Sequence, residues 1–218
     1  KMVAPGLAGF QTIMRLHDAE MIAHPEARWG ITAGNPIHDA IRSIAVLSGV
    51  DFSLDVAINS NRQITRVAAG ELFTVHSEIS SAVKRSSMQA FHEPFDVVVT
   101  TNSGYPLDQN LYQTVKGLSA ASQVVKEGGV ILCASECSEG LPSHGEYQKI
   151  LTERDNPEAL LDMICSAGHN RADQWEVQIQ AQIQRRANVF LKTDGLTDKE
   201  VRAAHLEPID DIAAATLE

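Results

Sequence analysis

The sequence predicts an α/β protein, and the segment between residues 97 and 137 carries most of the evidence. A β-branched strand at Val97–Thr101 precedes a helical stretch over residues 107–129, and the apolar strand "VILCASEC" follows. Strand, helix and strand in this order form a βαβ unit, whose strands lie parallel with a right-handed crossover. The chain has 218 residues, 44% apolar and 21% charged, which is typical of one large globular domain or two small ones.

The residues before this unit predict three helices and a pair of strands. Apolar residues at helical spacing indicate a helix over residues 10–23. Asn35 as the N-cap and Pro36 at the first helical position indicate a second helix that closes at Gly49. Two strands are expected around the polar turn Asn59–Arg62, and a long helix is expected over residues 72–91.

The residues after the βαβ unit continue the alternation of helices and strands. Helices are expected around 144–153, 156–167 and 173–187, and "NVFLKT" adds a short strand. A further helix begins at Thr197, where Glu200 completes a capping box. The change of character near residue 92 divides the chain into two α/β domains, residues 1–91 and 92–218.

Charge and cysteine usage exclude several classes of protein. The chain has 18 basic and 28 acidic residues, and its net charge of −10 repels a phosphate backbone, so no nucleic-acid partner is expected. No apolar run approaches the roughly 20 residues of a membrane span, so no membrane partner is expected either. The spacing of Cys133, Cys137 and Cys165 fits neither a disulfide framework nor a zinc site, and buried reduced thiols are expected, as in a cytoplasmic protein.

The βαβ unit lacks the usual nucleotide-binding motifs, but it offers an anion site. The loop "TNSGYPLDQN" contains neither a dinucleotide-binding glycine fingerprint nor a phosphate-binding P-loop. Tyr112, Gln113 and Lys116 share one face of the following helix, where an ammonium, an amide and a phenol can bind a small carboxylate. A solvated helix face explains the same spacing. The eight histidines form no metal-binding motif, and no nucleophilic triad is evident.

Three separated motifs resemble one known family. The opening "KMVAPGLAGFQTIMRLH", the "GNP" before a helix and "SGYPLDQNLYQTVKG" are together similar to the nickel-dependent lactate racemase family, in order and over the whole chain. The resemblance implies a nickel-pincer nucleotide cofactor, with Lys1 as its covalent anchor and His17 as a nickel ligand. It implies substrate-carboxylate contacts at Tyr112, Gln113 and Lys116. Trp175 matches an aromatic residue near the cofactor, although a core tryptophan explains it equally well.

The implied activity is racemisation or epimerisation of a small 2-hydroxy acid by a hydride shuttle, with the active site in a cleft between the two α/β domains. In the family the two general-base histidines precede the anchoring lysine, so no catalytic base is expected in this chain. The chain is therefore expected to be the C-terminal portion of such an enzyme, inactive without the missing N-terminal segment, with an incomplete first domain that favours homo-oligomers. The alternative is a non-catalytic α/β binding module for small carboxylates.

Overall fold

The computed structural model describes residues 3–217, and the chain divides into two compact units. The first unit contains the residues up to Leu16 and those from His24 to Phe91. The second contains the segment His17–Ala23 and the chain from His92 onward. The short segment after Leu16 thus packs with the second unit, although it precedes most of the first unit in the sequence.

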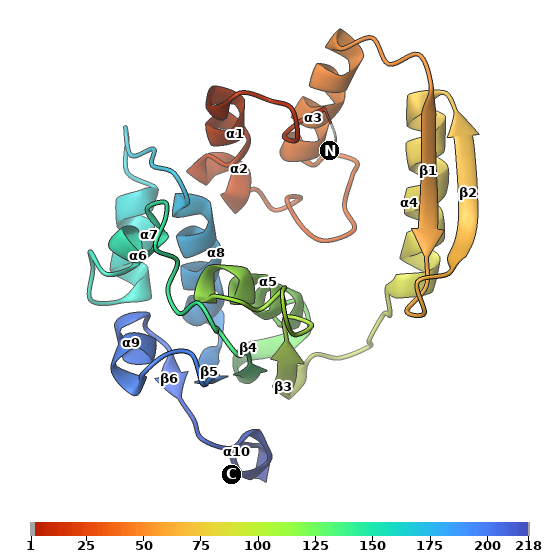
Figure 1. The fold of residues 1–218 in the computed structure, drawn as a ribbon. Coiled ribbons are helices and arrows are strands. Elements are labelled where there is room, and N and C mark those ends of the chain that lie inside the picture. The colour runs from red at the N-terminus through yellow and green to blue at the C-terminus, as the bar shows by residue number, and fades with distance from the viewer. Residues whose placement is uncertain (1–2, 218) are drawn as a thin grey trace. The chain divides into compact units, whose positions relative to one another are not determined.

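In its described residues, the first unit contains three helices and a β-hairpin (Figure 1). The helices are α1 (Phe10–Leu16), α3 (Pro36–Leu47) and α4 (Leu72–Ser87), and the strands are β1 (Ser53–Ile58) and β2 (Ile64–Gly70). The side chain of Asn35 accepts hydrogen bonds from the backbone N–H groups of Ile37 and His38, which fixes the start of α3 as the sequence predicts.

The hairpin of the first unit has two different faces. The strands β1 and β2 are antiparallel, with Val56 opposite Val67. Ala57 and Ala68 are buried on the face covered by α4, and Ala68 packs there against Val75 and Ile79. Apolar side chains that alternate with these alanines lie on the other face, so α4 covers one side of the hairpin only.

The second unit is built on a four-stranded parallel sheet with the order β3-β4-β5-β6. Its strands are β3 (Phe95–Thr101), β4 (Val125–Ala134), β5 (Asn188–Lys192) and β6 (Glu207–Pro208). Its helices are α2 (Ala19–Ala23), α5 (Leu111–Ala121), α6 (Tyr147–Leu151), α7 (Pro157–Ile164), α8 (Gln174–Arg186), α9 (Asp198–Ala203) and α10 (Ile212–Leu217). This sheet is the parallel βαβ arrangement that the sequence predicts.

The core of the second unit lies between its sheet and the helices α5 and α8. Leu111, Val115 and Leu118 of α5 are buried there with Ile131 and Cys133 of β4. Gly128 and Gly129, which the sequence suggests as the end of the helix, instead lie within β4. Gly128 has a positive φ, and the pairing of β3 with β4 shifts between Phe95 and Val97 to accommodate it.

Several expected elements differ in length from those observed. The helix expected over residues 10–23 is two helices, because Asp18 caps α2 by accepting a hydrogen bond from Met21 N–H. The helix expected over residues 107–129 is shorter at both ends: Asn110 caps α5, and Val125 already pairs with Phe95 in the sheet. The helix α4 ends at Ser87 rather than 91, and β6 and α10 were not anticipated.

The expectation about the cysteines is wrong for one of the three. All three are free thiols, and Cys133 and Cys137 are buried in the core. Cys165 is exposed, because it caps the C-terminus of α7 outside the core.

Candidate functional site

The predicted carboxylate-binding residues lie together on α5. Asn110 accepts a hydrogen bond from Gln113 N–H at 3.1 Å through its Oδ1 and so begins the helix. The Nζ of Lys116 donates a hydrogen bond to Gln113 Oε1 and lies 5.9 Å from the centroid of the Tyr112 ring. Lys116 is exposed, and Tyr112 and Gln113 are half-buried. This face therefore offers an ammonium and an amide to an anion from solvent.

The phenol of Tyr112 joins this face to helix α8. Trp175 donates a hydrogen bond from Nε1 to Tyr112 Oη at 2.9 Å, and the rings of Tyr112 and Tyr147 make a T-shaped contact with their centroids 5.4 Å apart. Burial, followed by the nearby Glu176 carboxylate, raises the pKa of Tyr112 to about 12. The phenol is therefore neutral near pH 7 and keeps its own proton to donate.

His17 is in ring contact with the same tryptophan, Trp175. The centroids of the imidazole and the indole are 4.8 Å apart, with the ring planes tilted by 44°. The segment that carries His17 is tied to α8 by a buried side chain, because Gln178 donates a hydrogen bond from Nε2 to Ala19 O at 2.8 Å. Two residues that are 158 positions apart in the sequence are thus in ring contact.

The five predicted site residues within the described chain therefore form one continuous cluster, His17–Trp175–Tyr112–Gln113–Lys116. Each contact lies inside the second unit. The sixth, Lys1, lies outside the described residues.

A buried carboxyl group next to this cluster was missed by the sequence analysis. Glu176 is only 5% exposed, and burial raises its pKa to about 7, although the ammonium of Lys116 opposes that shift. No local sequence signal marks it, because the burial of this part of helix α8 is a property of the folded chain.

The side chains that could ligate a metal are sparse. Among residues 3–217, no group of three or more His, Cys, Asp or Glu side chains could hold a metal ion. His17 alone offers one imidazole, a nitrogen donor that suits nickel as well as other borderline metals. This donor set fits a metal that arrives with most of its ligands already supplied by a cofactor.

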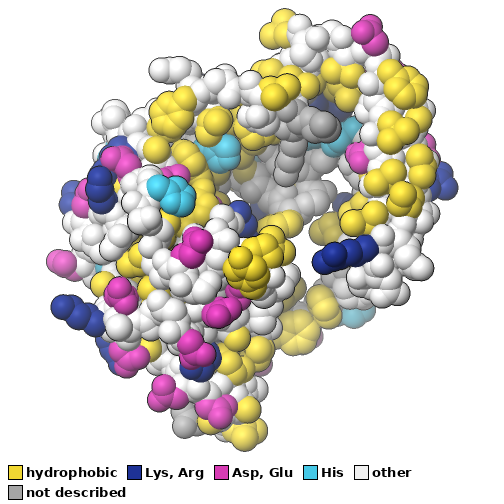
Figure 2. Space-filling view, in the orientation of Figure 1, with side chains coloured by type: hydrophobic (Ala, Val, Ile, Leu, Met, Phe, Trp, Pro, Cys, Tyr) yellow, Lys and Arg dark blue, Asp and Glu magenta, His cyan; other side chains and the backbone are white. Residues whose placement is uncertain are grey.

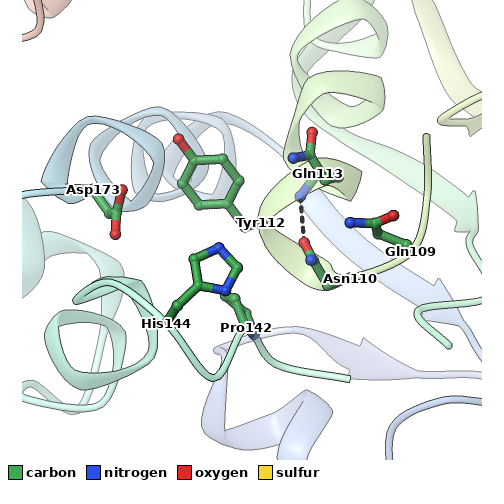
Figure 3. Close-up of a pocket in the computed structure, with 7 residues that line it drawn as sticks. All are labelled: Gln109, Asn110, Tyr112, Gln113, Pro142, His144 and Asp173. Carbon is green, nitrogen blue, oxygen red and sulfur yellow. Dashed lines mark hydrogen bonds between the residues drawn. The ribbon is translucent and has the colours of Figure 1, made fainter. Parts of the chain in front are cut away.

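A pocket with a volume of about 180 Å³ adjoins Tyr112 and Gln113. Its other walls come from the loop before α5, the loop after β4 and the N-terminus of α8. Because helices α5 and α8 both begin at the carboxyl edge of the parallel sheet, the pocket lies where α/β sheets commonly bind ligands (Figure 3).

The fold and this site together define an α/β protein with an ammonium, an amide and a phenol clustered on the helix that begins at the carboxyl edge of a parallel sheet. Residues 91–218 match the model of the lactate racemase C-terminal domain, and the chain belongs to the lactate racemase family. It is 36% identical, over 218 residues, to the lactate racemase of Thermoanaerobacterium thermosaccharolyticum, covering 99% of this chain and 50% of that protein. It is 34% identical, over 210 residues, to that of Lactiplantibacillus plantarum, covering 95% and 49%.

Two solved structures are similar in fold to this chain. The lactate racemase apoprotein from Thermoanaerobacterium thermosaccharolyticum superposes with a TM-score of 0.91 at 34% identity, over 98% of this chain and 51% of that one. A crystal structure of a protein from Thermotoga maritima shares the fold with a TM-score of 0.55 at 14% identity, covering 82% and 48%. The chain spans about half the length of the curated relatives it matches.

One further property concerns membranes. Within residues 3–217, each helix is too short or too polar to cross a lipid bilayer.

Proposed function

We propose that this chain is the C-terminal portion of a nickel-pincer-nucleotide-dependent racemase or epimerase of 2-hydroxy acids. Family membership supports the proposal, and so does the continuity of the cluster from His17 through Trp175 to Lys116, which is the observation that carries it. A residue expected to ligate nickel contacts Trp175, and a residue expected to bind the substrate carboxylate lies over Tyr112, the ring to which Trp175 donates a hydrogen bond. That arrangement suits a reaction in which substrate and cofactor must meet.

The residues present fit the cofactor. His17 would ligate nickel through its imidazole, Lys1 would be the covalent anchor, and the indole of Trp175 would fix the orientation of the imidazole by ring contact. When bound, the cofactor supplies a hydride acceptor that removes hydride from C2 of the substrate and returns it.

The face of α5 would bind the substrate. The ammonium of Lys116 and the amide N–H of Gln113 would donate hydrogen bonds to the carboxylate, and the neutral phenol of Tyr112 has a proton left to donate. Racemisation passes through a flat 2-keto acid that must receive hydride on its opposite face. A carboxylate held by two donors leaves C2 free to reorient while preventing the intermediate from diffusing away.

The general bases are expected upstream of Lys1, so this portion alone would bind substrate without turning it over. Turnover would require the preceding segment of the same protein. The competing proposal, a non-catalytic module for small carboxylates, shares the anion site but needs neither Lys1 nor His17.

The two proposals are separated by intact-mass spectrometry of the full-length protein, produced together with enzymes that make the cofactor. A nucleotide adduct on the peptide containing Lys1 is expected, and it should be absent from Lys1→Ala. Nickel content should fall to background in His17→Ala and stay at the wild-type level in His92→Ala, a change at an exposed histidine. An unmodified Lys1, or full nickel content in His17→Ala, would favour the binding module.

A further inference from the structure

The pocket beside Tyr112 and Gln113 is lined by further polar side chains that have no role in the proposed binding of the substrate carboxylate. Gln109 and Asn110 come from the loop before α5, and His144 comes from the loop after β4. Asp173 precedes α8, and Figure 3 shows it with His144 on one side of the pocket and the amide side chains on the other. A ligand held by its carboxylate at Gln113 could therefore extend its far end into this space.

The side chains that line the pocket limit which chemical groups the ligand can carry at the end away from its carboxylate. Of the described residues that line the pocket, none is Lys or Arg, and Asp173 places a carboxylate there, so a second anionic group would be repelled. Apolar surface is limited to Pro142 and the ring of Tyr112, which leaves little for an alkyl chain to contact. Amide, imidazole and carboxylate groups together offer both donors and acceptors, the combination that hydroxyl groups match.

The wall formed by Asp173 and His144 is held in place by local structure. Asp173 has a positive φ of 66° and accepts a hydrogen bond from Glu146 N–H at 2.9 Å through Oδ2. This bond ties the loop that carries His144 to the start of α8. A side chain at Gly145 would clash with the Asp173 carboxylate, so the loop can approach this closely only because residue 145 is glycine.

We propose that this pocket binds the distal hydroxyl groups of a polyhydroxylated 2-hydroxy acid, with His144, Gln109 and Asp173 as the residues that select it. The inference rests on the proposed function, since the substrate carboxylate must be held at Lys116 and Gln113. At about 180 Å³ the pocket has room for several water molecules, so a short hydroxylated chain fits. The methyl group of lactate would leave these polar groups to water, and malate would bring a second carboxylate next to Asp173.

The test compares four substrates with the full-length enzyme carrying its cofactor: the trihydroxy acid erythronate, lactate, malate and 2-hydroxyhexanoate. The expected result is the highest kcat/KM for erythronate. In His144→Ala the ratio of kcat/KM for erythronate to that for lactate should fall about tenfold, which is the effect of one hydrogen bond. Gln109→Ala should lower the same ratio, and the surface control His92→Ala should leave it unchanged.

The outcomes separate this inference from the proposed function. A preference for malate or 2-hydroxyhexanoate, or an unchanged ratio in both variants, would overturn the pocket assignment while the racemase assignment stands. If none of the four acids is turned over, the racemase assignment fails. Calorimetric titration of erythronate into the same protein then tests the pocket assignment. Binding that is weakened by His144→Ala supports the assignment, and undetectable binding rejects it.

Discussion

At the scale of single residues, the site depends on the contacts of one charged side chain, Lys116. Lys116 is exposed, yet its ammonium contacts Gln113 and lies over the ring of Tyr112, and it also moderates the pKa of Glu176. A mobile surface lysine has no such set of neighbours. The contacts hold the ammonium beside Gln113, a residue that lines the pocket.

Replacing Lys116 with alanine in the full-length enzyme should weaken substrate binding. A charged hydrogen bond contributes about 1.5–3 kcal/mol, so KM is expected to rise by roughly 10- to 100-fold, with a smaller effect on kcat. Steady-state kinetics on a 2-hydroxy acid measures both constants. Lys149→Ala, at an exposed lysine on α6, serves as the matched control. Wild-type kinetics in Lys116→Ala would show that this helix face is only solvated and does not bind the substrate.

The buried carboxyl of Glu176 should make stability depend on pH. Because its pKa is raised from 4.5 to about 7, the folded state binds an extra proton between those two values. Burial of this carboxyl therefore costs no stability below pH 4.5; the cost grows between pH 4.5 and 7 and is complete above pH 7. From this shift the full cost is roughly 3 kcal/mol.

Glu176→Gln removes that cost, so the variant should be more stable than the wild type at pH 8 and nearly equal to it at pH 4.5. Urea unfolding at the two pH values measures the difference. Equal stability of the two proteins at pH 8 would mean that the Glu176 charge is compensated in the folded state.

At the scale of elements, the important junction is the one between α2 and α8. The segment that begins at His17 leaves the first unit and packs on the second, where the amide of Gln178 donates to the carbonyl of Ala19. The side chain of Gln178 is fully buried, so this bond is shielded from competing water. Gln178 is thus a positioning residue for the ring contact between His17 and Trp175, one helical turn away on α8.

Gln178→Ala should loosen this junction without unfolding the sheet. One neutral hydrogen bond contributes about 1 kcal/mol, so amide exchange in residues 17–23 should speed up roughly fivefold while exchange in β4 stays unchanged. Hydrogen-exchange mass spectrometry resolves the two segments. Gln182→Ala, a half-buried glutamine one turn further along α8, should leave residues 17–23 unaffected. Equal protection in both variants would show that packing alone holds α2.

The elements also show which features are readable from sequence. The caps at Asn35 and Thr197 were predicted correctly because a cap depends on residues three positions apart. The boundary between α5 and β4 was misplaced because Val125 becomes a strand residue through pairing with Phe95, 30 positions away. Helix α8 was predicted, but its burial was not. Gln174, Gln178 and Gln180 read as a polar face, yet all three are buried and each makes at least one side-chain hydrogen bond.

The candidate site divides in the same way. Tyr112, Gln113 and Lys116 were grouped from helical spacing, and the structure places them together. His17 and Trp175 entered only through the family resemblance, since no local pattern links residues so far apart. Glu176 and the pocket beside His144 were found by neither route, because burial of a carboxyl and the convergence of three loops are properties of the folded chain.

At the scale of the whole molecule, the chain matches about half of its relatives, and one surface of the first unit bears on how it behaves alone. The hairpin face opposite α4 exposes large apolar side chains, and Figure 2 shows hydrophobic groups gathered over these strands. Leu54, Ile58, Ile64 and Val67 are each more than half exposed. We expect this face to associate with a second copy of the chain, since contiguous apolar surface of this kind rarely stays in water.

The chain by itself should therefore form oligomers at micromolar concentration, as measured by sedimentation velocity. The double variant Ile58→Thr and Val67→Thr keeps β-branched side chains on the strands but removes apolar area from this face, so its sedimentation should shift toward the monomer. Thr12→Val, a change on α1 away from the hairpin, controls for a general effect of composition. A wild-type chain that stays monomeric at every concentration would show that the apolar face has no affinity for a second copy.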